Sequence, residues 1–194
     1  MRMDAKNPPK ALMIVLIALL TVGLGFLADF AITCLEKTAY PRDYAEYAEV
    51  YALKYGVPEA LVFAVIRTES DFDSGAVSGA GAVGLMQIMP DTFGWLTDEV
   101  LFEHLEQGML YDPETNIRYG TYYLSYLYDR YGDWELALAA YNGGLGNVDK
   151  WLSDDRYADG EGGLKKIPFK ETRQFVKRVS DTRDMYDKLY ENTK

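Results

Sequence analysis

The sequence predicts an all-α protein in which one membrane-spanning helix precedes a globular helical domain. Residues 11–28 are uncharged and almost wholly apolar, which is the composition of a membrane span. Apolar side chains recur at helical spacing through most of the remaining chain, and alternating strand patterns are nearly absent. With 194 residues, of which 48% are hydrophobic, the chain is long enough for one domain of ordinary size and an appendage.

The first predicted element is a membrane anchor over residues 11–32. Eighteen apolar residues of helix span about 27 Å, which is close to the ~30 Å hydrocarbon core of a bilayer. Asp29 interrupts the apolar run and is expected near one interface. Basic residues precede the segment and acidic residues follow it, so the positive-inside rule predicts that residues 1–10 are cytoplasmic. The rest of the chain is then extracytoplasmic.

Two other fates of this segment remain open. Gly23, Gly25 and Ala28 leave cleavage as a signal peptide possible, although the apolar run is longer than that of an ordinary signal peptide. Cys34 is the only cysteine, which excludes an internal disulfide and leaves lipidation of its thiol as an alternative. The residues that precede Cys34 form a poor lipoprotein cleavage site. We expect residues 33–42 to be a connector and residues 43–194 to be the exported domain.

The exported domain is predicted to begin with two helices. Tyrosines and Ala48 recur at i, i+3, i+4, i+7 and i+11 from Tyr44, which predicts an amphipathic helix that ends at Gly56. Pro58 occupies a first helical position and opens a buried helix, whose apolar run leads to Glu69. Residues 73–84 follow as an irregular, glycine-containing stretch.

Three more helices are predicted in the second half of the domain. Asp112-Pro113 begins a long helix that ends at Gly132. Asp133 is expected to cap a short helix over residues 134–141, which is apolar nearly all round and therefore buried. Residues 153–168 look irregular, and the last helix covers residues 170–190. Its expected inner face carries Phe175, Val176, Val179, Tyr186 and Leu189.

The composition excludes several classes of function. A net charge of −10 argues against nucleic acid as a partner, because nucleic-acid binding needs a basic face. His104 is the only histidine and is expected on the surface; with one distant cysteine it does not make a zinc site. We expect no metal and no cofactor. The 16 tyrosines suit a carbohydrate cleft, where a ring stacks on a sugar and its hydroxyl binds, although most are expected as half-buried helix residues.

A glycine pattern after the second helix matches a dinucleotide-binding fingerprint, Gly79-Ala-Gly81-Ala-Val-Gly84. That fingerprint needs a strand before it and a helix that opens at it. No strand is predicted here, and Pro90 is expected to break a helix at this point. The glycines are better explained as positions where the backbone approaches a ligand closely.

Glu69 is the candidate catalytic residue. It ends the apolar run of residues 60–66, and a carboxyl group at the end of a buried helix loses hydration, which raises its pKa. A carboxylic acid that stays protonated near neutral pH can donate a proton to a glycosidic oxygen. Tyr141 and Asn142 precede two glycines and are interpreted either as a helix end with a core tyrosine or as the rim of a cleft beside Glu69.

Four segments, taken in order, resemble the soluble-lytic-transglycosylase (Slt) type of peptidoglycan lytic transglycosylase. They are Glu69-Ser-Asp-Phe72, Gly81-Ala-Val-Gly-Leu-Met-Gln-Ile-Met-Pro90, Ala140-Tyr-Asn-Gly-Gly144 and Pro168-Phe-Lys-Glu-Thr-Arg173. The resemblance covers residues 43–190 and implies a lysozyme-like all-α fold with peptidoglycan glycan strands as substrate. It also implies that Glu69 is the only catalytic carboxyl, and that the substrate contacts are Ser78, Met86, Gln87, Tyr141 and Asn142.

The resemblance further implies a reaction that consumes no water. Glu69 would protonate the oxygen between N-acetylmuramic acid and N-acetylglucosamine, and then take a proton from the muramic acid 6-hydroxyl, which closes a 1,6-anhydro ring. The substrate's own acetamido group would replace a second carboxylate. Two alternatives stay open: a lysozyme of related fold that uses Asp71, Asp73 or Asp91 as a base, and a wall-binding scaffold without turnover.

Overall fold

The computed structural model describes residues 9–190, which divide into two units between Pro41 and Arg42. Most of the predicted cytoplasmic segment, residues 1–8, and the last four residues lie outside the described part of the chain.

The first unit consists of one helix, α1 (Lys10–Ala39). It is the only helix in residues 9–190 that is long and apolar enough to cross a membrane, and its most apolar window has a mean hydropathy of 2.7. A signal sequence would satisfy the same criteria. The helix covers the predicted anchor and continues to Ala39, so most of the predicted connector is helical. The limits of the cytoplasmic segment, anchor, connector and domain stay predictions. Cys34 is exposed.

The second unit is helical, and residues 42–190 contain only isolated β-bridges and no strand. The prediction of an all-α protein is therefore confirmed. Its elements are α2 (Ala45–Tyr55), α3 (Glu59–Ser70), α4 (Pro90–Trp95), the π-helical turn η1 (Leu96–Val100), the 3-10 helix η2 (Gln107–Tyr111), α5 (Pro113–Tyr131), α6 (Trp134–Gly143), α7 (Leu145–Leu152) and α8 (Lys170–Tyr190).

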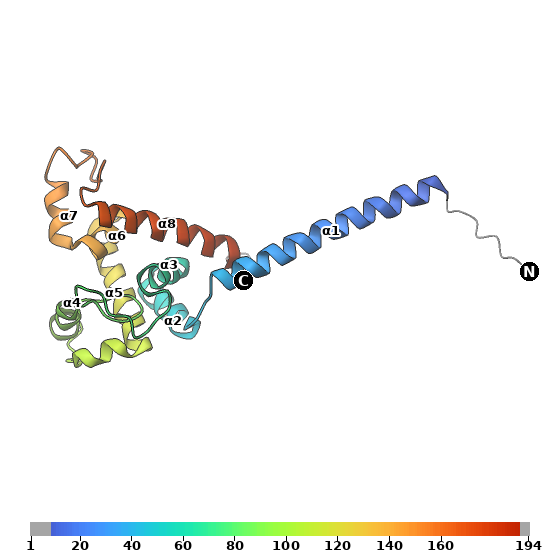
Figure 1. Cartoon of the computed structure of the whole chain (residues 1–194). Helices are drawn as coiled ribbons and strands as arrows, with labels where there is room; N and C mark the ends of the chain where they lie inside the picture. Colours follow the sequence, from blue (N-terminus) through green and yellow to red (C-terminus); the bar gives the residue numbers. More distant parts are fainter. Residues whose placement is uncertain (1–8, 191–194) are drawn as a thin grey trace, which may run out of the picture. The chain divides into compact units, whose positions relative to one another are not determined.

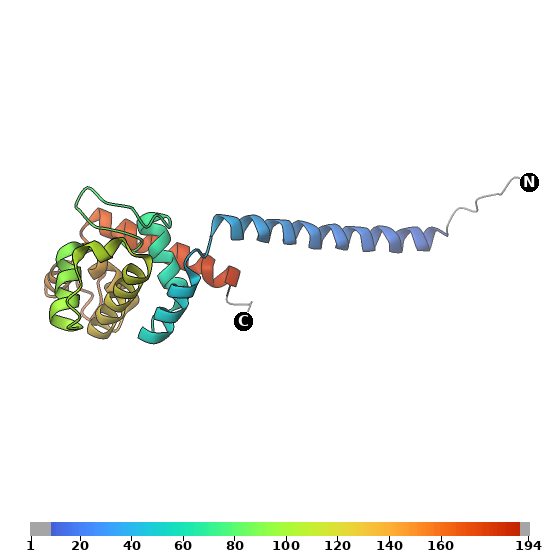
Figure 2. The ribbon, with the colours of Figure 1, turned by 90° about the horizontal axis from the view of Figure 1, so that it is seen from below.

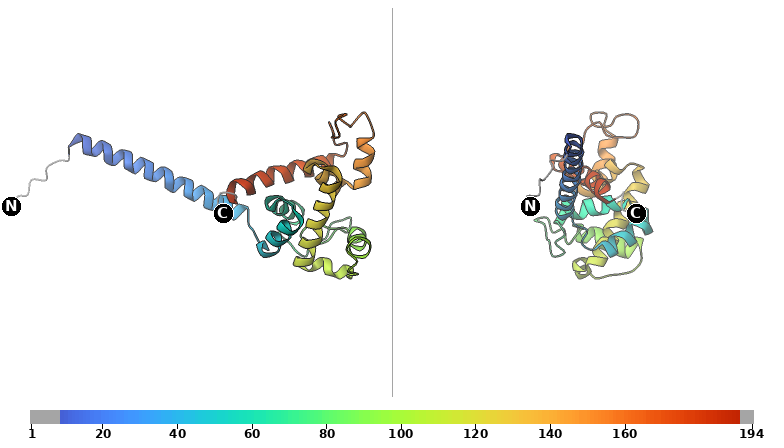
Figure 3. Two further views of the ribbon diagram at one scale, coloured as in Figure 1. Left: turned by 180° about the vertical axis from the view of Figure 1, so that it is seen from behind. Right: turned by 90° about the vertical axis from the view of Figure 1, so that its right-hand side faces the viewer.

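The core forms around α5, which packs against α2 on one side and α6 on the other (Figure 1). Helix α8 packs against both α3 and α6 (Figure 3). The predicted inner face of α8 is buried at every position. The buried helix predicted over residues 134–141 is also confirmed, because residues 136–140 of α6 are inaccessible to solvent.

The predicted helix boundaries have the expected capping groups. The Asp112 carboxylate accepts a hydrogen bond from Thr115 N at 2.9 Å, and the Asp133 carboxylate accepts one from Leu136 N at 2.8 Å. Gly56 and Gly132 end α2 and α5 in the left-handed conformation that glycine adopts without strain.

The structure adds short helices that the sequence analysis missed. Pro90 was expected to break a helix; instead it occupies the first position of α4, where its missing N–H costs no hydrogen bond. Gly144 ends α6, as predicted, and at the same point α7 begins. These helices have six to eight residues, which is too short for a 3.6-residue period to stand out. The stretch after α3 is irregular, as predicted (Figure 2).

Candidate active site

Glu69 lies in the last turn of α3, directly after the buried residues 61–66. The helix stops one residue later because Asp71 and Phe72 both adopt positive φ angles, of 48° and 68°. The Ser70 hydroxyl oxygen lies 2.8 Å from Leu85 O and 3.1 Å from Ile66 O, and its single proton is shared between these two acceptors. The bond to Leu85 O ties the end of α3, where Glu69 lies, to the loop that leads into α4.

Burial raises the pKa of Glu69 from 4.5 to about 7. Two charged side chains of α8 act in opposite directions: the Arg178 guanidinium lowers this pKa, and the Glu171 carboxylate raises it. Desolvation is the largest of these effects. A substantial fraction of Glu69 is therefore protonated at neutral pH, which an exposed carboxyl group would not be.

The loop before α4 is held by a buried amide. Asn116, on α5, accepts a hydrogen bond from Met86 N at 2.8 Å and donates to Val83 O at 2.9 Å and to Leu110 O at 2.8 Å. Gly84 makes this arrangement possible. Its φ is +80°, and a Cβ atom at this position would lie 2.2 Å from the Asn116 amide nitrogen. The sequence analysis attributed the glycines to close approach of a ligand, whereas at Gly84 the close neighbour is Asn116.

Met86 is placed differently from the expectation that it lines a cleft. Its side chain is completely buried and packs on Gly120, where an added Cβ would lie 2.5 Å from the Met86 sulfur. The side chain is therefore not available to a ligand in this structure. The backbone carbonyl of Met86 contacts another predicted site residue, because it accepts a hydrogen bond from the Tyr141 hydroxyl at 2.7 Å.

Tyr141 connects the loop to α6 and to Glu69. Its ring lies between Tyr123, with 5.5 Å between ring centroids, and Phe175 of α8, at 6.4 Å and nearly parallel. Burial raises the pKa of the Tyr141 hydroxyl well above 10, and the negative charge of Glu69 raises it further. The phenol is therefore neutral and acts as a hydrogen-bond donor near the carboxyl group.

A small hollow beside Tyr141 brings some of the predicted site residues together. It is lined by Gln87, Ile88, Met89, Thr92, Tyr123 and Tyr141. Gln87 has a φ of 47°, and its side-chain nitrogen donates to Gly84 O at 2.8 Å and to Ala76 O at 3.1 Å. The side chain is thereby fixed at the edge of the hollow.

The other two predicted contacts lie outside this hollow. Asn142 is half-buried on α6, next to Tyr141. Ser78 is exposed in the irregular loop, where its hydroxyl oxygen accepts a hydrogen bond from Ala82 N at 3.0 Å. The roles of Glu69 and of these five residues toward a substrate remain predictions.

The sequence analysis missed an aromatic array that continues from the hollow. Tyr123 is flanked by Trp95 of α4, whose ring centroid lies 6.4 Å away, and Trp95 also contacts Tyr126 edge-on at 5.2 Å. Thr92 lies one turn before Trp95 and lines the hollow. In the sequence, this array is indicated only by the i, i+3 spacing of Tyr123 and Tyr126. The contact of these two rings with Trp95 follows from the packing of α4 beside α5 and could not be predicted from local spacing.

Within the described residues, no group of three or more His, Cys, Asp or Glu side chains could hold a metal ion. His104 is exposed, as predicted, and its ring lies 3.3 Å from the Asp98 carboxylate.

The raised pKa of Glu69 predicts a pH-dependent stability. Between pH 4.5 and about 7 the folded protein keeps a proton on Glu69 that the unfolded chain releases. This stabilising contribution is fully present below pH 4.5 and is lost as pH rises through about 7. The Glu69→Gln variant has no such proton to lose. Its free energy of unfolding should therefore exceed that of the wild type by up to ~3 kcal/mol above about pH 8, and match it near pH 4. Urea unfolding across this range measures the difference, and parallel profiles would contradict the prediction.

Comparison with known proteins identifies the family of the chain. The family model of the Transglycosylase SLT domain matches residues 46–162. The chain is 37% identical over 143 residues to the soluble lytic murein transglycosylase of Escherichia coli K12. This alignment covers 72% of this chain and 22% of that protein. It is 31% identical over 177 residues to the membrane-bound lytic murein transglycosylase C of Edwardsiella ictaluri, covering 80% of this chain and 49% of that protein.

A solved structure shows the same fold. The 70 kDa soluble lytic transglycosylase of Escherichia coli superposes with a TM-score of 0.71 at 35% identity, over 79% of this chain and 25% of that chain. The prediction of a lysozyme-like helical fold is thereby confirmed. The chain spans about a fifth of the length of the soluble relatives that it matches.

Proposed function

The chain belongs to the family defined by the Transglycosylase SLT domain, and from this premise we propose that it is a lytic transglycosylase that cleaves the glycan strands of peptidoglycan. The two relatives compared above are both named as murein transglycosylases. The observation that carries the proposal is Glu69, whose pKa burial raises to about 7 at the end of a rigid helix. A carboxylic acid that is protonated in part at neutral pH suits a group that must donate a proton and then accept one.

The first step assigns Glu69 as general acid. It donates its proton to the oxygen that joins N-acetylmuramic acid to N-acetylglucosamine, and the bond from that oxygen to C1 breaks. The substrate's own acetamido oxygen stabilises C1, so no second protein carboxylate attacks. The Tyr141 hydroxyl is already committed to Met86 O, which fixes the ring beside the reacting groups.

In the second step the ionised Glu69 takes the proton of the muramic acid 6-hydroxyl, whose oxygen then bonds to C1. The product is a 1,6-anhydro ring, and Glu69 returns to its protonated state. Because both reacting groups belong to one sugar, the step is intramolecular, and correct positioning supplies on the order of 7–11 kcal/mol in well-oriented cases. Gln87, Tyr141 and Asn142 are proposed as residues that hold the sugar in this position, together with the exposed Ser78. For Met86 we propose a supporting role through its backbone carbonyl.

Hydrolysis by a second carboxylate has less support. Asp71, Asp73 and Asp91 are all exposed, and the Asp71 carboxylate is 3.8 Å from Arg67. A non-catalytic scaffold has no need of a buried acid such as Glu69, so a site with this acid intact favours turnover.

We place the enzyme at the membrane with α1 as a single-pass anchor. The apolar length of α1 and the membrane-bound relatives support membrane association. The basic residues that precede the helix favour an orientation in which the N-terminus is cytoplasmic and the domain faces the wall.

The masses of the products test the reaction. The full-length chain, solubilised in detergent, is incubated with purified peptidoglycan, and the released muropeptides are analysed by mass spectrometry. We expect anhydro products, each lighter by one water than the hydrolytic product. Reducing ends would identify a lysozyme instead, and binding without release would identify a scaffold.

A further inference from the structure

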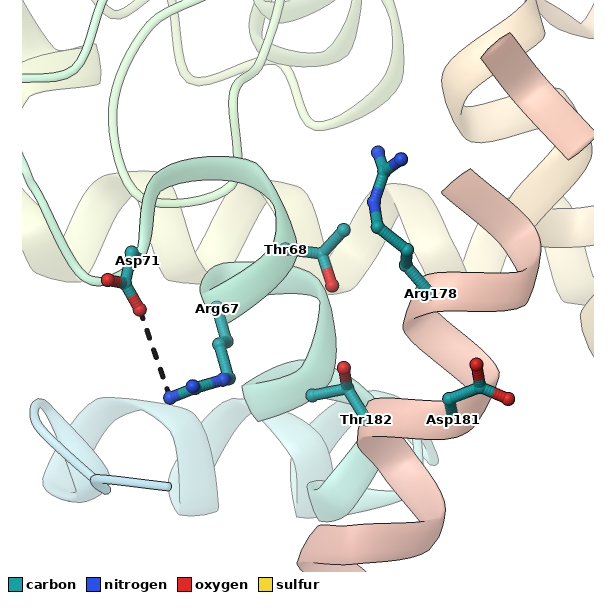
Figure 4. A pocket seen from close by; sticks show the side chains of 6 residues that line it. All are labelled: Arg67, Thr68, Asp71, Arg178, Asp181 and Thr182. Carbon is teal, nitrogen blue, oxygen red and sulfur yellow. Dashed lines mark ion pairs between the residues drawn. The ribbon is translucent and has the colours of Figure 1, made fainter. Parts of the chain in front are cut away.

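A second hollow opens between α3 and α8, beside the candidate acid. It is lined by Arg67, Thr68, Asp71, Arg178, Asp181 and Thr182. Figure 4 shows Thr68 on α3 and Thr182 on α8, with their side chains in the space between the two helices. The Arg178 side chain extends from α8 on the side of Thr68. Glu69 does not line this hollow, but Arg178, which does, lies close enough to that carboxyl group to lower its pKa.

The charges that line this hollow are paired, with one exception. Arg67 lies 3.8 Å from the Asp71 carboxylate, and Lys177 lies 2.8 Å from that of Asp181. Arg178 has no hydrogen bond and no ion pair to any residue within the described range 9–190. Its guanidinium is therefore available to a ligand, with the hydroxyl groups of Thr68 and Thr182 nearby as further donors.

We propose that this hollow binds a carboxylate of the stem peptide that hangs from the muramic acid residues of the glycan, a proposal that rests on the function proposed above. With the stems attached, the lactyl carboxyl group of each muramic acid is bound in an amide, so the free carboxylates, which a guanidinium recognises best, lie on the stem. Arginine presents its N–H donors in a planar fork that matches a carboxylate, and such charge-assisted bonds are strong. The stem is attached to the sugar whose bond is broken, so its carboxylates reach the surroundings of Glu69.

Occupation of the hollow changes the electrostatic environment of the acid. Glu69 faces Arg178 and Glu171 from α8 and Tyr141 from α6. Free Arg178 lowers the pKa of Glu69. A carboxylate bound to Arg178 offsets that charge, and Glu69 then keeps its proton to higher pH. Binding of the stem and protonation of the acid favour each other, as linkage requires.

Activity on two substrates tests the proposal. The full-length wild type and the Arg178→Ala and Arg178→Lys variants are assayed in detergent on peptidoglycan with native stems and on the same peptidoglycan after its stem carboxylates have been capped as amides. We expect Arg178→Ala to lose about tenfold in kcat/KM on native peptidoglycan and little on the capped substrate, with partial rescue by lysine. Lys188→Ala is the control, because it removes a positive charge from the same helix ten residues away, about 15 Å along the axis.

Direct binding provides a readout that is independent of turnover. Stem peptide released from peptidoglycan by an amidase is titrated by calorimetry into the Glu69→Gln chain, with and without Arg178→Ala. Binding that Arg178→Ala abolishes supports the proposal. Equal binding to both chains, or an equal loss of activity on both substrates, would overturn it. If the wild type releases no product from either substrate, the proposed function fails, and the titration still decides whether the hollow binds the stem.

Discussion

Replacing Glu69 with glutamine is expected to lower the release of muropeptides at least about a thousandfold, because one side chain performs both proton transfers. Glutamine has nearly the same shape and cannot donate an acidic proton. The helical fold should be unchanged, since burial of the charged form of Glu69 costs stability and the substitution removes that cost. Initial rates on purified peptidoglycan and circular dichroism measure the two effects.

The matched controls for Glu69→Gln are the three carboxylates that a hydrolase would use. Asp71→Asn, Asp73→Asn and Asp91→Asn each remove one exposed acid close in sequence to the site. We expect each variant to keep most of its activity and the same anhydro products. A loss in any one of them that equals the loss in Glu69→Gln would instead identify a pair of carboxylates and a hydrolytic mechanism.

Replacing Asn116 with alanine is expected to destabilise the domain by on the order of 3–5 kcal/mol. The substitution leaves two buried backbone groups without a partner, Met86 N and Leu110 O, and removes one of the two bonds to Val83 O, which still accepts from Ile88 N at 3.0 Å. Each unsatisfied group costs about 1–3 kcal/mol, and the total is a large part of the stability of an ordinary domain. The activity of the protein that remains folded should also fall, because the loop that carries the Met86 carbonyl positions Tyr141.

Urea unfolding of the full-length chain in detergent measures this effect. Asn147→Ala is the control, because it removes a single half-buried bond, from the Asn147 amide to Gly143 O at 2.8 Å. We expect a loss of about 1 kcal/mol for the control. If both variants were destabilised equally, the buried amide of Asn116 would not be what holds the loop.

Much of the fold was predictable because its signals are local. Asp112 and Asp133 cap helices at the residues where the sequence predicts helix starts, and Gly56 and Gly132 end helices as left-handed residues. Helix α3 is buried, as its apolar run predicts, and α8 buries the face that its periodicity predicts. The short helix α4 was not predictable in the same way, because its six residues contain fewer than two turns and Pro90 serves equally as a start or a break.

Side-chain direction in the loops was the less predictable part of the site. Met86 and Gln87 are neighbours in one motif, yet Met86 is buried on Gly120 and Gln87 borders the hollow. A positive φ at Gln87 and the bonds of Asn116 set these directions. Asn116 lies 30 residues from Met86 in the sequence, and no local pattern links the two residues.

Local patterns are enough to predict the class of fold, the apolar N-terminal helix and the position of Glu69 at the end of a buried helix. These properties follow from apolar periodicity and capping residues, which act over a few neighbouring residues. The groups that surround the Glu69 carboxyl follow from the packing of the helices: Tyr141 comes from α6, Glu171 and Arg178 come from α8, and Thr68 borders the hollow between α3 and α8. Sequence patterns do not predict this environment, because desolvation and charge at a site depend on distances in space between helices that lie far apart along the chain.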